Sequence, residues 1–274
     1  MSSSEFPRPD VPLALCDIDG TLIDGSYAFT DPDIYGVVED VQNAGWTLGL
    51  SSDTPYEGMV RYRDMLGMNG PIIAEKGSVV ELAGSLSYDI EEAQLFAAAF
   101  SAIKRNLTDE GVVMWEGNPV EAIYDKLKIG NVGDMVVLMN SLRKCSLGIF
   151  PRQINETGDM VIDDNLTNKI VEQVRPLYPD LPDLGEDLNH DYGLLILSRE
   201  AITKRRGSQK LIALGGIAGR FAMIGNSAAD YVGSDLAVHY AVGDATTVFR
   251  EQADYVAGKP GTAGVVEILR QLIR

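Results

Sequence analysis

The chain has 274 residues, 45% of them hydrophobic, and a mean hydropathy of −0.01. These values predict a globular protein with one large domain or two smaller ones, and no apolar run is long enough to cross a bilayer. The formal net charge of −17 argues against nucleic acids and anionic membranes as partners, although local cations can still attract an anionic small molecule.

The ends of the chain and its cysteines carry little functional signal. The opening MSSSEFPRPD lacks the positive and apolar regions of a signal peptide, which favours a cytoplasmic protein. Cys16 and Cys145 are far apart and fit no metal-binding spacing, so a disulfide framework is not expected. Cys16 lies within an apolar run and is expected to be buried as a small hydrophobic residue.

The first third of the chain alternates strands and helices. A continuous apolar run predicts a strand over 11–16, and further strands are expected at 46–52 and 70–75. Helices are expected over 31–45, which opens with Asp-Pro, and over 55–67. Strands joined by helices through short connections pair in parallel with right-handed crossovers.

The middle of the chain differs in character from the first third. It predicts a helix over 91–107 and two more within 131–145 and 165–178. The segments that resemble strands are 111–117, 146–153 and 192–198. A loop rich in Pro and Asp is expected at 179–191. The pattern indicates a separate α+β unit inserted into the first domain.

The last part of the chain returns to the alternation of strands and helices. Its expected elements are helices over 204–217, 246–253 and 261–274 and strands over 220–226, 239–245 and 254–258. The sequence therefore predicts an α/β protein with a parallel-sheet core domain at 1–83 and 200–274 and an inserted α+β domain at 84–199.

Polar side chains follow the expected core strands at the points where those strands end. Asp17 and Asp19 follow the first strand, one residue apart, and Ser52 ends the second. Asn226 ends the first strand after the insert, and Lys204 opens the helix before it. Open parallel sheets bind ligands beyond the carboxyl ends of their strands, so we expect these side chains to meet there.

These groups predict a site for a phosphate monoester and a hard cation. Mg²⁺ prefers carboxylate, water and phosphate oxygens as ligands. Asp17, Asn226 and Asp230 can supply the ligands that come from the protein. Ser52 and Lys204 can hold the phosphoryl oxygens. A carboxylate can attack phosphorus to form an aspartyl-phosphate, and a neighbouring carboxylate can protonate the leaving oxygen and later deprotonate water.

The motifs that carry these residues resemble those of the haloacid dehalogenase-like hydrolase superfamily. The relevant stretches are DIDGTL (17–22), a later lysine and GNSAAD (225–230). More closely, the chain looks like the Cof-type phosphatases of subfamily IIB, which GMNGPIIAEKG (67–77), HYAVGDA (239–245) and ADYVAGKPGTAGVVEIL (253–269) also resemble. The resemblance covers about 11–82 and 203–274, and implies a Rossmann-like core with an inserted α+β cap of type C2B.

The resemblance also assigns roles to the residues that match its motifs. It implies that Asp17 is the nucleophile and Asp19 the general acid and base, and that Ser52 and Lys204 bind the phosphoryl group. The implied ligands of Mg²⁺ are Asp17, Asp19, Asn226 and Asp230. The implied reaction is hydrolysis of a small phosphorylated metabolite, as in the similar phosphoglycolate, sucrose-phosphate and mannosyl-3-phosphoglycerate phosphatases.

Three departures from the family pattern affect these expectations. Asn226 stands where the family usually has an aspartate that binds the metal, and Ala229 stands where it usually has an asparagine. An amide oxygen can ligate Mg²⁺ but brings no charge, so we expect weaker metal binding. The run SSDTP (51–55) stands where relatives often have Thr-Gly-Arg.

Two alternatives to a phosphatase follow from the same residues. A phosphomutase of the phosphomannomutase type would pass through the same aspartyl-phosphate and return the phosphoryl group to a sugar. A degenerate member would bind phosphorylated ligands without turning them over, which Asn226 favours and the retained Asp17 and Asp19 oppose. The inserted domain is expected to act as a cap that selects the substrate. Its candidate contacts are Arg143, Lys144, Arg152 and His190, with surface charge or structural contact as the alternative for each.

Overall fold

The computed structural model describes residues 6–25, 27–177, 183–190 and 192–274. The chain divides into two units: Met1–Ser87 with Ile202–Arg274 (unit 1), and Tyr88–Ala201 (unit 2). Unit 1 extends four residues past the expected boundary at 83, because the strand at 85–87 pairs within its sheet.

Unit 1 is built on an eight-stranded sheet with the strand order β14-β13-β12-β1-β2-β3-β4-β5. The six strands from β14 to β3 run parallel, whereas β4 and β5 form an antiparallel extension at one edge. The strands are β1 (Leu13–Cys16), β2 (Thr47–Ser51), β3 (Ile72–Ala74), β4 (Val79–Leu82), β5 (Ser85–Ser87), β12 (Phe221–Gly225), β13 (Ala237–Ala241) and β14 (Tyr255–Val256).

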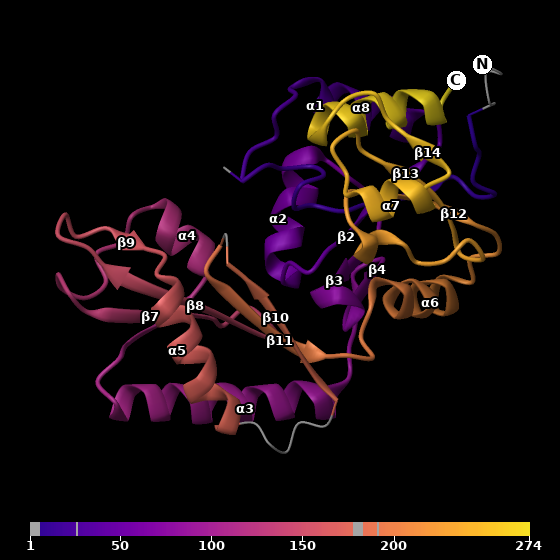
Figure 1. The fold of residues 1–274 in the computed structure, drawn as a ribbon. Helices are drawn as coiled ribbons and strands as arrows, with labels where there is room; N and C mark the ends of the chain where they lie inside the picture. The colour runs from indigo at the N-terminus through magenta and orange to yellow at the C-terminus, as the bar shows by residue number, and fades with distance from the viewer. Residues whose placement is uncertain (1–5, 26, 178–182, 191) are drawn as a thin grey trace. The chain divides into compact units, whose positions relative to one another are not determined.

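Helices connect these strands and cover both faces of the sheet. They are α1 (Asp33–Asn43), α2 (Tyr56–Leu66), α6 (Lys204–Gly215), α7 (Thr247–Gln252), α8 (Gly261–Leu272) and the short 3₁₀ helices η1 (Glu75–Gly77) and η3 (Ala228–Asp230). Helices α1 and α8 lie side by side, and α6 packs on β3 and β4 (Figure 1).

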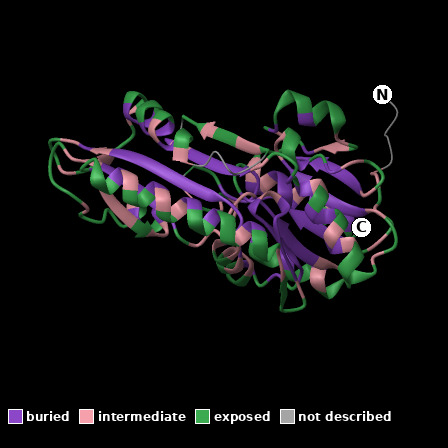
Figure 2. Cartoon of the chain, turned by 90° about the horizontal axis from the view of Figure 1, so that it is seen from below, coloured by how far each residue is buried: buried purple, intermediate pink, exposed green. Residues whose placement is uncertain are grey.

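The apolar pattern of the sequence explains this layering. All four residues of β1 are buried, as expected for a strand covered on both faces. Helix α1 buries Ile34, Val37, Val38 and Val41, which recur at helical spacing. The central strands of the sheet are buried, whereas the helices expose their outer faces (Figure 2).

Unit 2 contains a separate sheet with the strand order β10-β11-β8-β7-β6, and β9 pairs with β8. Its strands are β6 (Val113–Gly117), β7 (Met135–Asn140), β8 (Leu147–Ile154), β9 (Met160–Val161), β10 (Leu184–Asn189) and β11 (Leu194–Arg199). Its helices are α3 (Ile90–Asp109), α4 (Pro119–Tyr124), α5 (Asp164–Val174) and the 3₁₀ helix η2 (Arg175–Leu177). Residues of α3 and α5 share one apolar core with the sheet.

Two predictions for unit 2 are wrong. The segment 131–145 contains the strand β7 instead of a helix, because its apolar run lies between β6 and β8 and is buried in the sheet. Residues 184–189 of the expected loop form the edge strand β10, paired with β11. Residues 179–182 and 191 of that loop lie outside the described residues.

The predicted fold class is confirmed: a parallel α/β core carries an inserted α+β unit. Among the described residues, the structure contains no helix with the length and apolar character needed to span a membrane.

Candidate active site

The central strands of unit 1 bring the predicted site residues to one edge of its sheet. Strand β1 lies between β12 and β2, with Cys16 opposite Ile224 on one side and Leu50 on the other. Because all three strands are parallel and in register, the residues that follow them lie together. The backbone N–H of Asp17 extends this pairing by donating to the Ile224 carbonyl at 2.9 Å.

A buried cluster of three charged side chains forms at this edge. Lys204 Nζ lies 2.7 Å from Asp17 Oδ1 and 2.6 Å from Asp230 Oδ1. The side chains of Lys204 and Asp17 are 4% and 7% exposed, and that of Asp230 is fully buried. Two carboxylates thus share one ammonium group, and the buried cluster has one negative charge in excess when all three are ionised.

The second oxygen of each carboxylate is held as well. Asp17 Oδ2 accepts from the hydroxyl of the buried Thr21 at 3.2 Å. Asp230 Oδ2 accepts from the backbone N–H groups of Asn226 and Ser227, both at 2.9 Å, and from the Ser227 hydroxyl at 3.2 Å. Asp230 therefore closes the turn after β12 and holds Lys204 with its remaining oxygen.

Lys204 opens helix α6, whose first turn lies close to the 3₁₀ helix η1 through Gly77 and Gly207. The Thr203 hydroxyl accepts from the Arg206 N–H and begins the helix. A Cβ on Gly77 would lie 2.4 Å from the Thr203 carbonyl oxygen, and one on Gly207 would lie 2.7 Å from Gly77 Cα. Only glycine at both positions lets η1 and the first turn of α6 come this close, which brings Lys204 to Asp17.

Asp19 and Ser52 are joined through Thr54. The Thr54 hydroxyl lies 3.2 Å from Asp19 Oδ2 and 3.1 Å from Ser52 Oγ. Asp19 is exposed, whereas Ser52 is 1% exposed. The sequence had indicated Asp19 and Ser52 but not Thr54 or Thr21, whose partners are visible only in the fold.

Burial and charge shift the pKa values of the cluster. Burial, with the Asp230 charge beside it, raises the pKa of Asp17 to about 8, although Lys204 opposes the shift. Burial disfavours the charged form of Lys204, but Asp17 and Asp230 outweigh it and raise the pKa of that ammonium group. Lys204 is therefore always charged near neutral pH, and the cluster favours an additional proton or another cation.

The Asn226 side chain lies against the turn that follows Asp19. A Cβ on Gly20, whose φ is +73°, would lie 2.2 Å from Asn226 Nδ2, so only glycine leaves room for the amide. Side-chain oxygens of Asp17 and Asn226 at this edge fit the preference of Mg²⁺ for hard oxygen ligands, as does the cluster's excess negative charge. Within the described residues, no three His, Cys, Asp or Glu side chains are grouped to bind a metal, so the protein supplies few charged ligands.

The turn that carries Asp230 is also held by a buried histidine. His239 Nε2 accepts from the backbone N–H of Val232 at 3.1 Å, so this nitrogen is unprotonated. Burial lowers the pKa of His239, although Asp254 and Asp230 oppose the shift. The ring packs against Tyr231, with the ring centroids 4.5 Å apart.

The four candidate residues of the inserted domain lie in different environments of unit 2. Arg152 is 4% exposed and donates to the carbonyls of Pro151, Tyr192 and Gly193, which favours a structural role. His190 is exposed and pairs with Asp164 at 3.2 Å. Arg143 donates to the Ser146 hydroxyl at 2.9 Å in the turn between β7 and β8, which also carries Lys144.

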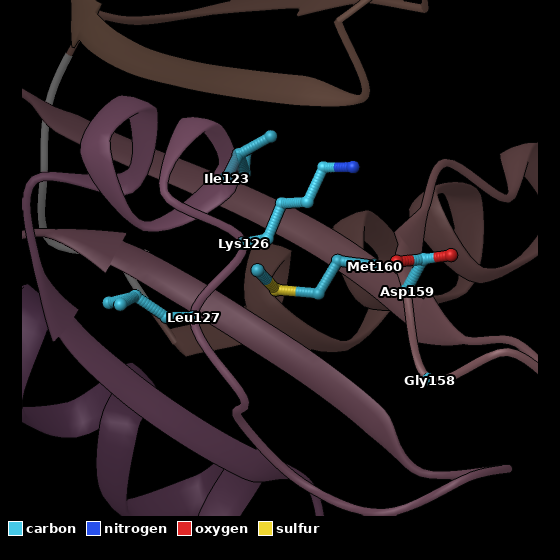
Figure 3. A pocket seen from close by; sticks show the side chains of 6 residues that line it. All are labelled: Ile123, Lys126, Leu127, Gly158, Asp159 and Met160. Atoms are coloured by element: carbon cyan, nitrogen blue, oxygen red, sulfur yellow. The ribbon is translucent and has the colours of Figure 1, made fainter.

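Unit 2 also contains a small cavity of about 200 Å³ between α4 and the turn before β9 (Figure 3). Its lining residues are Ile123, Lys126, Leu127, Gly158, Asp159 and Met160. None of them is a predicted site residue, and the cavity contains no pair of groups that suggests catalysis.

Comparisons with known proteins agree with this arrangement. Over residues 14–269 the sequence matches the profile of the haloacid dehalogenase-like hydrolases. A search among curated proteins gave no significant match.

Several solved structures share the fold. A haloacid dehalogenase-like hydrolase from Bacteroides thetaiotaomicron is 16% identical, with a TM-score of 0.67 over 95% of this chain and 98% of its own. A protein from Thermoplasma acidophilum is 16% identical, with a TM-score of 0.64 over 96% and 98%. A sugar phosphatase of HAD subclass IIB is 15% identical, with a TM-score of 0.57 over 96% and 100%.

The chain therefore belongs to the haloacid dehalogenase-like hydrolase family, and the prediction of this family and of a hydrolytic enzyme is confirmed.

Proposed function

We propose that this family member is a Mg²⁺-dependent phosphatase that hydrolyses a small phosphorylated metabolite through an aspartyl-phosphate intermediate. The observation that carries the proposal is the position of Asp17 at the carboxyl end of β1, with Lys204 bridging it to the buried Asp230. A nucleophilic carboxylate beside a fixed ammonium group suits attack on an anionic phosphoryl group, whose charge the ammonium offsets.

The residues take the following roles in this proposal. An oxygen of ionised Asp17 attacks phosphorus as the bond to the leaving oxygen breaks, and protonated Asp19 gives its proton to the departing alkoxide. Asp19, now ionised, takes a proton from water as that water attacks the Asp17 phosphate, which releases inorganic phosphate and restores Asp17. Lys204 and the Ser52 hydroxyl contact the phosphoryl oxygens and stabilise their charge.

Asp17 and Asn226 would hold the metal in this proposal. Bound Mg²⁺ supplies positive charge that stabilises the phosphoryl oxygens and the ionised form of Asp17. Asp230, which is fully buried and accepts from Lys204 and from the backbone N–H groups of Asn226 and Ser227, would act by fixing Lys204 and this turn. Asp19 stays a predicted ligand of the metal, because it follows Asp17 by two residues.

Substrate selection would come from unit 2. Arg143, Lys144 and His190 are its cationic or titratable candidates, which suits an anionic or polar metabolite of the sugar phosphate or phosphoglycolate type. The similarity in fold to a sugar phosphatase of HAD subclass IIB supports the sugar phosphate class. Action in the cytoplasm also belongs to this proposal.

The test is phosphate release from p-nitrophenyl phosphate across a Mg²⁺ titration, with Asp17→Asn as the matched variant. Turnover that depends on Mg²⁺ and is lost in Asp17→Asn supports the proposal. Where p-nitrophenyl phosphate is not cleaved, a panel of sugar phosphates and phosphoglycolate follows. If no compound of the panel releases phosphate but one of them still stabilises the folded protein, a non-catalytic binding protein would be favoured. Transfer of phosphate between sugar positions would favour a mutase.

A further inference from the structure

The hydroxyl of Thr54 links two residues of the proposed mechanism that lie far apart in the sequence. Its oxygen is 3.2 Å from Asp19 Oδ2, across 35 positions of the chain, and 3.1 Å from Ser52 Oγ. It belongs to the loop between β2 and α2, whereas Asp19 belongs to the turn after β1.

The direction of these hydrogen bonds follows from the number of protons. The Thr54 hydroxyl donates its one proton to Asp19 Oδ2, which can accept both when Asp19 is ionised and when the proton that Asp19 transfers is on Oδ1. The contact with Ser52 then uses the serine proton, so Ser52 donates to Thr54 in this arrangement, and in the proposed mechanism that proton turns to a phosphoryl oxygen. Ser52 Oγ in turn accepts from the Thr54 backbone N–H at 3.2 Å, a local turn that fixes the two side chains relative to each other.

The rest of Thr54 has little freedom to move. Its carbonyl accepts from the Glu75 N–H at 3.2 Å, which ties the loop to η1. Its methyl group faces α2, where a Cβ on Gly58 would lie 3.1 Å from Thr54 Cγ2. The hydroxyl is therefore presented from a fixed point to the Asp19 carboxyl group, which is exposed.

We propose that Thr54 is a positioning residue that holds the Asp19 carboxyl group toward the leaving oxygen and couples its orientation to that of Ser52. The inference rests on the proposed function, because it assigns to Asp19 the proton transfer described above. In this proposal Thr54 does not contact the phosphoryl group and acts through Asp19 and Ser52. It acts by keeping Asp19 within reach of the proton that it transfers.

The test compares Thr54→Val, which keeps the shape but loses the hydroxyl, with Thr54→Ser, which keeps the hydroxyl. Thr108→Val, an exposed threonine of unit 2, is the matched control. Two esters are used, because p-nitrophenolate leaves readily without a proton whereas phenolate depends more on protonation. We expect Thr54→Val to lower kcat/KM about tenfold on phenyl phosphate and less than about threefold on p-nitrophenyl phosphate. Thr54→Ser should recover most of the loss.

A structural role alone would reduce turnover of both esters equally and would not be rescued selectively by serine. Equal losses on the two esters, no loss in Thr54→Val, or no rescue by Thr54→Ser would each overturn the inference while leaving the phosphatase intact. Failure of the wild type to cleave phenyl phosphate would also overturn it, because no proton would then reach the leaving oxygen. Failure on every ester would remove the proposed function and this inference with it.

Discussion

Replacing Lys204 with methionine tests the charge balance of the buried cluster. The substitution keeps the length of the side chain and removes the ammonium group that lies 2.7 Å from Asp17 and 2.6 Å from Asp230. At an effective dielectric constant of about 20, each of these contacts is worth roughly 6 kcal/mol of Coulomb energy, most of which offsets the cost of burying the charges. Loss of one member of such a buried group leaves two uncompensated carboxylates and should cost about 3–5 kcal/mol of unfolding free energy at pH 8.

The cost should depend on pH in a definite direction. Without the ammonium group, the pKa of Asp17, already raised by burial and by the Asp230 charge, rises further in the folded state, so the folded variant takes up a proton that the unfolded chain does not bind. Its stability relative to the wild type therefore improves as the pH falls from 8 to 5. Asp17→Asn added to Lys204→Met removes one of the uncompensated charges and should recover part of the loss.

Urea unfolding measured by tryptophan fluorescence is the assay. Trp115→Phe as the background leaves Trp46 as the reporter in unit 1. Arg206→Met, an exposed cation on the same helix, is the control and should change the free energy by less than about 0.5 kcal/mol. A loss below about 1 kcal/mol in Lys204→Met at pH 8, or a loss that does not vary between pH 5 and 8, would refute the charge balance described here.

Three further predictions address the surroundings of the cluster. Asn226→Asp should tighten Mg²⁺ binding about tenfold in calorimetry without substrate, because it adds a charged ligand; unchanged affinity would show that residue 226 does not contact the metal. Gly207→Ala should cost about 1–3 kcal/mol in urea unfolding, since its Cβ would lie 2.7 Å from Gly77 Cα, and stability equal to the wild type would contradict this packing. Burial lowers the pKa of His239, so below about pH 6.5 the unfolded chain binds a proton that the folded state does not. The contribution of His239 to stability therefore falls as the pH is lowered, and His239→Asn should show a pH slope of unfolding free energy that differs from the wild type in this range; equal slopes would contradict it.

The sequence predicted that the site residues meet at one edge of the sheet, because this placement depends on local rules. Asp17, Ser52 and Asn226 each follow an apolar run, and parallel strands place such residues at one edge of the sheet. Lys204 could be expected from its place at the start of a helix. The hydrogen bonds that fix the cluster could not be read in the same way, because they join residues such as Lys204 and Asp17 that are 187 positions apart.

The errors in the predicted secondary structure have separate causes. The run MVVLM at 135–139 is short and apolar, and its pattern alone does not distinguish a buried strand from a buried helix. Strand β10 is rich in Gly, Glu, Asp and Asn, and it pairs only at the edge of the sheet, where polar residues are tolerated. The β4–β5 hairpin was also missed, because its turn places Ala83 at φ +51°, an uncommon conformation for alanine.

The residues that position other side chains could not be predicted from the sequence, for a related reason. Thr54 contacts Asp19 only because β1 and β2 are neighbours, and no spacing within SSDTP indicates that contact. Gly77 and Gly207 matter because η1 and α6 approach each other closely, and a glycine in a sequence does not reveal what lies next to it.

The most direct test of the central claim is to find the phosphoryl group on Asp17. The wild type and Asp17→Asn are mixed with p-nitrophenyl phosphate and Mg²⁺, quenched in acid within one turnover, digested and examined by mass spectrometry. The account predicts one phosphoryl group on the peptide that carries Asp17 in the wild type, lost with turnover in Asp17→Asn. Phosphate release with no phosphoryl group on that peptide, or turnover retained in Asp17→Asn, would contradict it.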